Sequence, residues 1–292
     1  MKLQSILQVP DLVINSMQYF TQEDLIKVLA TSRGVRTLFL SAMDLWPFPL
    51  IKLSSPKKNI TDTELKAVLS FSKLFQSITS LSLPKCRELT DESLKIFQSI
   101  KNLTELSLYG CCQVTNHGLI HLVHCSKLER LDLSNCSKIT RLKALSGLFG
   151  QLKTLNLAQC SNLRQVTFFS SSVVASPSNS TTSLLLKLDL SLCRHINDKR
   201  LTCCLQLLPC LQVLSIRGCS SVTNLGLYSI RDYSPRLAVL DISWLYLVTL
   251  EGLASSLGQL HCLSEVSMCG MKSPVVTVLR LLLPSVAILA DF

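Results

Sequence analysis

Apolar residues recur along this chain in one phrase of fixed spacing, Leu-x-x-Leu-x-Leu-x-x-Cys-x-x-Leu/Ile/Val-Thr-Asp/Asn. Seven good copies place the cysteine position at Cys86, Cys111, Cys136, Cys160, Cys193, Cys219 and Leu245, and a degenerate later copy places it at Met271. The successive steps are 25, 25, 24, 33, 26, 26 and 26 residues. A nearly constant period of this length predicts a solenoid built from stacked repeats.

Each repeat reads as a strand, a turn and a helix. The last two leucines of the phrase alternate, which predicts a short strand with one buried face. The cysteine follows where the chain leaves the strand, a position that suits a small, buried, apolar side chain. The Thr-Asp/Asn pair predicts a helix start, because a hydroxyl or carboxylate can accept the free amides of the first turn. Residues 93–97 and 118–122 then show helical apolar spacing.

The two ends and one long step depart from the regular repeat. Ile51, Leu53, Ile60 and Leu65 fit an opening repeat, and the segment from Leu283 to Ile288 fits a final strand. The 33-residue step contains a Ser-rich insertion at about residues 169–183, which we expect to form a loop bulging from the solenoid.

The repeat resembles the leucine-rich-repeat family, and specifically its cysteine-containing subfamily, over about residues 50–292. The resemblance implies an α/β solenoid with a curved parallel sheet inside and helices outside.

Residues 1–49 lack the repeat and predict a small helical segment, in which Pro10 suits a first helical turn and Thr21 with Asp24 suits a capping box.

That N-terminal segment resembles the F-box. Val9-Pro10, Asp24-Leu25, the segment from Ser32 to Leu38 and Leu45-Trp46 follow the family's order and spacing. Three positions depart from the pattern: Val9 replaces the usual Leu, Asp11 is followed by Leu rather than the usual Glu, and Val35 stands where Trp is common. An ordinary helical cap on the open end of the solenoid is the alternative, because solenoids require caps.

An F-box followed by leucine-rich repeats implies a substrate-recognition subunit of a Skp–cullin–F-box ubiquitin ligase. The chain would perform no chemistry itself, and its partners would be a Skp-family adaptor with its cullin ligase and an unknown protein substrate. The alternative is a leucine-rich-repeat interaction scaffold outside the ubiquitin system. Adaptor contacts are expected from the apolar F-box positions Pro10, Leu12, Val13, Leu25, Ile26 and Val28.

Substrate contacts are expected on the concave face, where the residues between the buried leucines of each strand lie. Most of these are small or polar. Bulky and charged side chains are typical interface anchors, and the candidates are Tyr109, Arg130, Asp132, Arg217, Asp241 and Trp244. Each could equally be an ordinary exposed strand residue.

The charge does not predict a nucleic-acid partner. The net charge of +10 divides into +3, +3 and +4 over residues 1–60, 61–150 and 151–292, so it is spread rather than gathered. No membrane anchor is expected either, since the N-terminus lacks a secretory signal and the apolar stretch from Val275 to Ala290 is short and contains Arg280 and Pro284.

The thirteen cysteines predict neither disulfides nor a catalytic or metal site. Leu245 and Met271 replace the repeat cysteine, which indicates that this position requires bulk rather than sulfur chemistry. Free thiols fit a cytoplasmic or nuclear protein. His117, His121 and His124 have helical spacing that can hold zinc, but nothing supplies an obvious fourth ligand, so we expect no metal and no cofactor.

Overall fold

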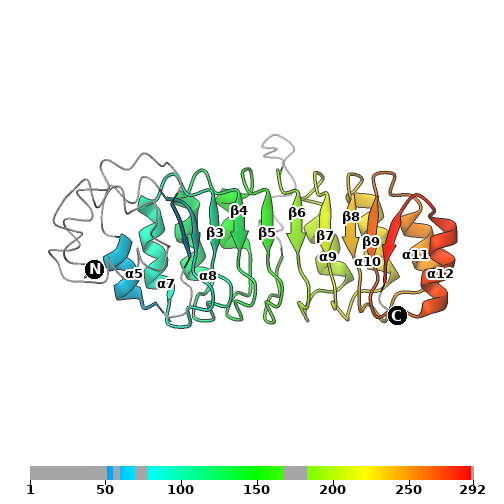
Figure 1. The fold of residues 1–292 in the computed structure, drawn as a ribbon, viewed down its shortest axis with the longest axis horizontal. Helices are drawn as coiled ribbons and strands as arrows, with labels where there is room; N and C mark the ends of the chain where they lie inside the picture. The colour runs from blue at the N-terminus through cyan, green and yellow to red at the C-terminus, as the bar shows by residue number, and fades with distance from the viewer. Residues whose placement is uncertain (1–50, 55–59, 70–77, 167–182, 291–292) are drawn as a thin grey trace, which may run out of the picture.

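The computed structural model describes residues 51–54, 60–69, 78–166 and 183–290. Its ten strands form one sheet in chain order, and every neighbouring pair is parallel (Figure 1). The strands are β1 (Ile51–Ser54), β2 (Ile78–Ser82), β3 (Glu105–Ser107), β4 (Arg130–Asp132), β5 (Thr154–Asn156), β6 (Lys187–Asp189), β7 (Val213–Ser215), β8 (Val239–Asp241), β9 (Glu265–Ser267) and β10 (Ala287–Leu289). The solenoid predicted from the repeat is confirmed, including a final strand at the last apolar segment.

Helices cover the other side of the sheet (Figure 1). They are α5 (Asp62–Leu69), α7 (Asp91–Leu94), η1 (Lys95–Ser99), α8 (Asn116–Leu119), η2 (Ile120–His124), η3 (Lys143–Leu148), α9 (Asp198–Leu205), α10 (Asn224–Tyr233), α11 (Leu250–Leu257) and α12 (Ser273–Leu282). The elements written η are 3₁₀ helices.

The kind of helix varies with the length of the repeat. The three steps of 26 residues contain α-helices of eight to ten residues. The steps of 25 residues contain one α-turn followed by a 3₁₀ turn, and the step of 24 residues contains a 3₁₀ helix in its described part. A 3₁₀ helix rises about 2.0 Å per residue against 1.5 Å for an α-helix, so it spans the same height with fewer residues.

One apolar residue at the centre of each strand forms the core of the stack. Leu106, Leu131, Leu155 and Leu188 pair in register across neighbouring strands, and each is at least 98% buried. The insertion between β5 and β6 leaves this register intact. The core therefore runs continuously beneath the sheet.

The repeat cysteines do more than fill space, because they add a contact that the expectation of bulk alone did not include. The thiol of Cys136 donates a hydrogen bond to the carbonyl oxygen of Leu108 in the preceding repeat, at 3.2 Å. Cys111, Cys160, Cys193 and Cys219 make the equivalent bond at 3.1 to 3.2 Å. The Leu108 carbonyl also accepts the Cys111 amide at 3.0 Å, so the thiol adds a second hydrogen bond to it and satisfies its own S–H group in the core.

A second contact ties neighbouring repeats together at their helix starts. Asp91 accepts hydrogen bonds from the backbone amide and the hydroxyl of Thr115, at 2.8 and 2.6 Å. Asp198 does the same for Thr223, at 2.8 Å for both bonds. Equivalent pairs join Asp62 to Thr90, Asn116 to Thr140, and Asn224 to Thr249. We call this series the Asx–Thr ladder.

Four threonines of the ladder also begin their own helices, as predicted: Thr90, Thr115, Thr223 and Thr249. The Thr223 hydroxyl accepts the amide of Leu225 at the start of α10. The helix that follows Thr223 packs closely against the ladder. A Cβ atom on Gly226 would lie only 2.7 Å from the carboxylate of Asp198. The glycine is therefore required by the approach of one helix to the acid of the preceding repeat.

The ladder is interrupted at two successive steps. Arg141 and Gln165 occupy Asx positions, and Arg164 and Asn197 occupy Thr positions. At the first of these steps, the backbone amides of Arg164 and Gln165 donate instead to the carbonyl oxygen of Thr140, at 3.0 and 3.1 Å. The described residues include no helix between η3 and α9, so the outer layer changes where the ladder stops.

The predicted F-box segment at residues 1–49 lies outside the described residues. The greater part of the predicted loop, residues 167–182, lies outside them too. The division of the chain into an F-box segment and a solenoid stays a prediction.

Candidate interaction face

The solvent-facing side of the sheet, which we call the concave face, carries two rows of side chains in register. The first row is formed by the residue before the buried central residue of each strand, and the second row by the residue after it. The first row is Ser80, Glu105, Arg130, Thr154, Lys187, Val213, Val239 and Glu265, and the second is Ser82, Ser107, Asp132, Asn156, Asp189, Ser215, Asp241 and Ser267. The predicted residues Arg130, Asp132 and Asp241 lie in these rows.

The two predicted aspartates are held in fixed orientations by serines. Asp132 accepts hydrogen bonds from the Ser107 hydroxyl at 2.9 Å and from the Ser134 amide at 3.0 Å. Asp241 accepts from the Ser243 amide at 3.0 Å and from the Ser215 hydroxyl at 3.3 Å. A carboxylate already fixed in place loses little rotamer entropy when a partner binds.

The predicted basic residues differ in their surroundings. Arg130 pairs with Glu105 at 3.2 Å, and both side chains are partly exposed, so this ion pair contributes little to stability. Arg217 is exposed, and no ion pair among the described residues includes it. Of the two guanidinium groups, that of Arg217 is the more available to a partner.

Tyr109 lies on the concave face, two residues after the end of β3. Its ring lies beneath the ammonium group of Lys85, 5.6 Å from the ring centroid, in a cation–π contact across one repeat. The ring is half-buried, so it offers a partner one aromatic face and the phenolic hydroxyl.

Trp244 does not lie on the strands, in contrast to the prediction that placed it on the concave face. It occupies the left-handed turn before the repeat cysteine position, with φ of 64°. Its ring lies over Gly270 of the next repeat, where a Cβ atom would meet the indole at 2.6 Å. Lys85, Asn135, Gln159 and Leu192 have the same left-handed conformation in their repeats. In each of these repeats the chain therefore turns away from the sheet at the residue before the cysteine position, which is the position of Trp244.

Two neighbours of Trp244 were not singled out from the sequence. Tyr246 is 69% exposed and packs edge-on against Trp244, with ring centroids 6.4 Å apart, and Leu247 is 54% exposed. We call Trp244, Tyr246 and Leu247 the aromatic turn. The signal was present, because the two positions after the cysteine are polar in other repeats, as in Ser161-Asn162 and Ser220-Ser221, but apolar here. Exposed aromatic groups beside polar residues are typical of protein-binding surfaces.

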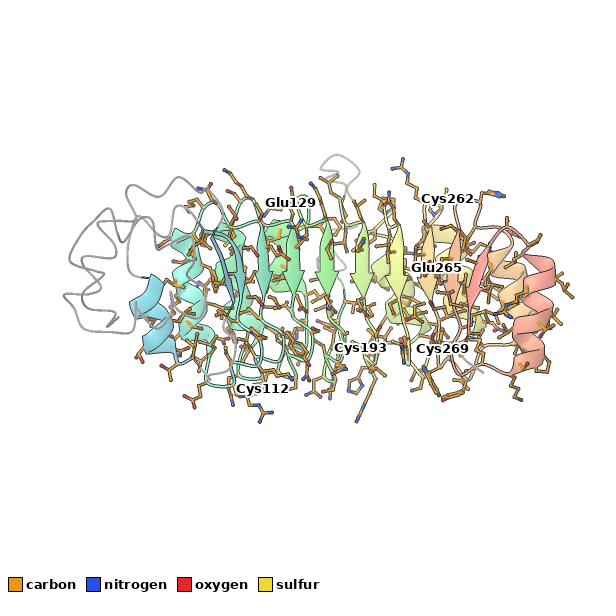
Figure 2. The ribbon with its side chains drawn as sticks, viewed as in Figure 1. Cys112, Glu129, Cys193, Cys262, Glu265 and Cys269 are labelled. Carbon is orange, nitrogen blue, oxygen red and sulfur yellow. The ribbon has the colours of Figure 1, made fainter. Side chains whose placement is uncertain are left out.

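The thiols divide into protected and accessible groups. Eight of the thirteen cysteines are buried, and burial raises the pKa of the Cys160 thiol to about 12. Cys262 is exposed, and Figure 2 shows it on the loop edge of the solenoid near β9. Because the thiolate is the reactive form, a buried cysteine with a raised pKa, such as Cys160, is a poor nucleophile.

Native thiol labelling follows from this division. With Ellman's reagent at pH 8, we expect Cys262 to react first and Cys160 to stay unmodified until the chain unfolds. Mass spectrometry of labelled peptides with and without guanidinium chloride measures both. Equal labelling of Cys160 and Cys262 in the folded chain would contradict the packing described here.

Within the described ranges, no group of three His, Cys, Asp or Glu side chains gathers in a way that could hold a metal ion. Nor does any helix there have the length and apolar character needed to cross a membrane.

Comparisons with known proteins agree with this geometry. A family model described as the At1g61320/AtMIF1 leucine-rich-repeat domain matches residues 50–175. The leucine-rich-repeat protein LegL7 from Legionella pneumophila is 19% identical, with coverage of 86% of this chain and 85% of that chain and a TM-score of 0.51. An internalin (inlF) from Listeria monocytogenes is 15% identical, with coverage of 92% and 74% and a TM-score of 0.51.

A further likeness, to a chain in the yeast Rad7 and Elc1 complex, has 17% identity, coverage of 99% and 89%, and a TM-score of 0.45, which is too low to carry an argument. No curated protein matches the sequence. The family model and the two structural likenesses above 0.5 agree on one fold, the leucine-rich-repeat solenoid.

Proposed function

We propose that this chain, a leucine-rich-repeat protein with a protein-interaction surface, is the substrate-recognition subunit of a Skp–cullin–F-box ubiquitin ligase. The observation that carries the proposal is the order of motifs along the chain. Val9-Pro10, Asp24-Leu25 and Leu45-Trp46 resemble the F-box, and cysteine-type repeats follow at once.

In this proposal the two parts of the chain bind different partners. The apolar positions Pro10, Leu12, Val13, Leu25, Ile26 and Val28 of the N-terminal segment bind the Skp-family adaptor. The solenoid binds the target protein, through the concave face at Tyr109 and Arg217 and through the aromatic turn. The protein acts in the cytoplasm or the nucleus, where such ligases assemble.

The chain contributes proximity rather than chemistry. By holding a target near the enzyme that carries ubiquitin, it raises the effective concentration of the target's lysines at the reactive thioester. Rigid presentation matters for such a role. The in-register core and the serine-fixed aspartates provide it.

Adaptor binding by the purified full chain tests the proposal. We expect a Skp-family adaptor to be retained by the wild-type chain, and binding to fall at least tenfold in a Pro10→Ala, Leu25→Asp double variant. The physical reason is that a charge at a buried interface position carries a large desolvation cost. Affinity measured by biolayer interferometry gives the ratio.

A matched control changes the solenoid instead. An Arg217→Ala, Tyr246→Ala double variant is expected to bind the adaptor like the wild type, since both residues lie far along the repeats. Failure of the well-folded wild-type chain to bind any Skp-family adaptor would leave the interaction-scaffold alternative in place of the ligase.

A further inference from the structure

A basic pocket lies where the Asx–Thr ladder is interrupted. Its volume is about 990 Å³, and it opens between the segments that follow Cys136, Cys160 and Cys193. Five of its lining residues are cationic: Lys138, Arg141, Arg164, Lys199 and Arg200. None of the residues that line it is Asp or Glu.

The interruption itself produces this pocket. Elsewhere an Asx side chain reaches from one repeat to the threonine of the next and closes the seam between them. Arg141 and Arg164 stand at those two positions, and neither guanidinium group can accept a hydrogen bond. Backbone hydrogen bonds to the Thr140 carbonyl join the two repeats here instead, and no Asx side chain fills the space outside them, which has positive charge on both of its sides.

None of the cations of the pocket forms an ion pair within the described structure. The four ion pairs among the described residues include none of the five cations. Lys138 donates to the neutral amide oxygen of Gln113, and Arg200 donates to the carbonyl oxygen of His195. Residues 133–188 contain no Asp or Glu at all, which also excludes a compensating acid from residues 167–182.

The one acid beside these cations in sequence is engaged elsewhere. Asp198 precedes Lys199 and Arg200, but its two carboxylate oxygens accept hydrogen bonds from Thr223 in the next repeat, at 2.8 Å each. Like charges gathered in one concavity repel one another, and a multiply charged anion relieves that repulsion.

We propose that this pocket binds a phosphorylated serine or threonine segment of a partner protein. Arginine forms bidentate, charge-assisted hydrogen bonds with phosphate, and clusters of Arg and Lys are the usual recognition element for phosphorylated peptides. A pocket of this size holds the phosphate and the residues that flank it. The site does not depend on the adaptor, so it stands apart from the ligase proposal.

Two other phosphate sources fit the lining less well. Single-stranded nucleic acids bind where aromatic side chains stack on bases, and no aromatic residue lines the pocket. Membrane surfaces are bound by cations beside exposed apolar groups, whereas the one aliphatic residue in the lining, Val166, is buried. A phosphorylated protein segment needs neither.

The test uses the full chain and immobilised degenerate peptides with phosphoserine at the centre, beside the same peptides without phosphate. We expect binding to the phosphorylated pool alone, reduced at least tenfold in an Arg141→Gln, Arg164→Gln double variant. Inorganic pyrophosphate should raise the melting temperature of the wild type and leave that of this variant unchanged.

The control is an Arg87→Gln, Lys101→Gln double variant, which removes the same net charge from exposed positions in other repeats. It should bind the phosphorylated pool like the wild type. Equal binding to both pools, equal losses in both variants, or no binding by the wild type would overturn the proposal. Binding to vesicles that contain a phosphoinositide, without binding to phosphopeptides, would overturn it too and assign the pocket to lipid.

Discussion

The Asp198→Ala variant is expected to lose about 2–4 kcal/mol of the free energy of unfolding. Two hydrogen bonds from Thr223 to a carboxylate disappear, and the backbone amide of Thr223, which is half-buried, is left without its partner. The loss should be measured as a lower midpoint of urea unfolding, followed by circular dichroism.

Asparagine at the same position is the matched control. Asn116 and Asn224 accept the threonine amide and donate to the threonine hydroxyl in their own repeats, so Asp198→Asn should cost less than about 1 kcal/mol. If the alanine and asparagine variants were equally unstable, the carboxylate would act through its charge, and the ladder would not be the cause.

Replacement of Phe97 by alanine is expected to cost about 3–5 kcal/mol. Phe97 lies in the 3₁₀ helix η1, has no exposed surface and ranks among the largest fully buried side chains. A 3₁₀ turn has weaker hydrogen-bond geometry than an α-helix, so the side chain is what holds this short element against the sheet. Its carbonyl oxygen also accepts the thiol of Cys125, at 3.4 Å.

Chemical denaturation of three variants separates packing from general disturbance of η1. Phe97→Leu should cost only about 1–2 kcal/mol because most of the volume is kept. Gln98→Ala changes an exposed neighbour and should stay within about 0.5 kcal/mol of the wild type. A small effect of Phe97→Ala would mean that the outer layer contributes little to the stability of the solenoid.

The architecture was predictable because one spacing rule governs it. The positions of Leu106, Leu131 and Leu155 in the phrase dictate both their burial and their register, and the structure confirms both. The thiol bonds were not predictable, since Leu245 at the same position suggests bulk alone. The sulfur's partner is a carbonyl group of the preceding repeat, and a pattern of side chains contains no information about it.

The candidate site was predictable in part. The alternation along the strands placed Arg130 and Asp132 on the concave face, but it could not place Trp244, because the left-handed turn breaks the alternation there. The basic pocket was missed for a different reason. The charge counted over long segments is even, whereas the relevant fact is that Arg141 and Arg164, 23 residues apart, stand at the two ends of one missing contact.

The interrupted ladder also bears on the mechanics of the whole solenoid. In a linear array of repeats, stability is approximately the sum of each unit and its coupling to the next. Asx–Thr contacts couple the units from Asp62 to Thr140 and again from Asp198 to Thr249, and these contacts are missing between the two blocks. Among the described repeats, we therefore expect bending or twisting of one block against the other to cost least at the junction of Arg141 and Arg164, where backbone hydrogen bonds stand in for the Asx–Thr contact.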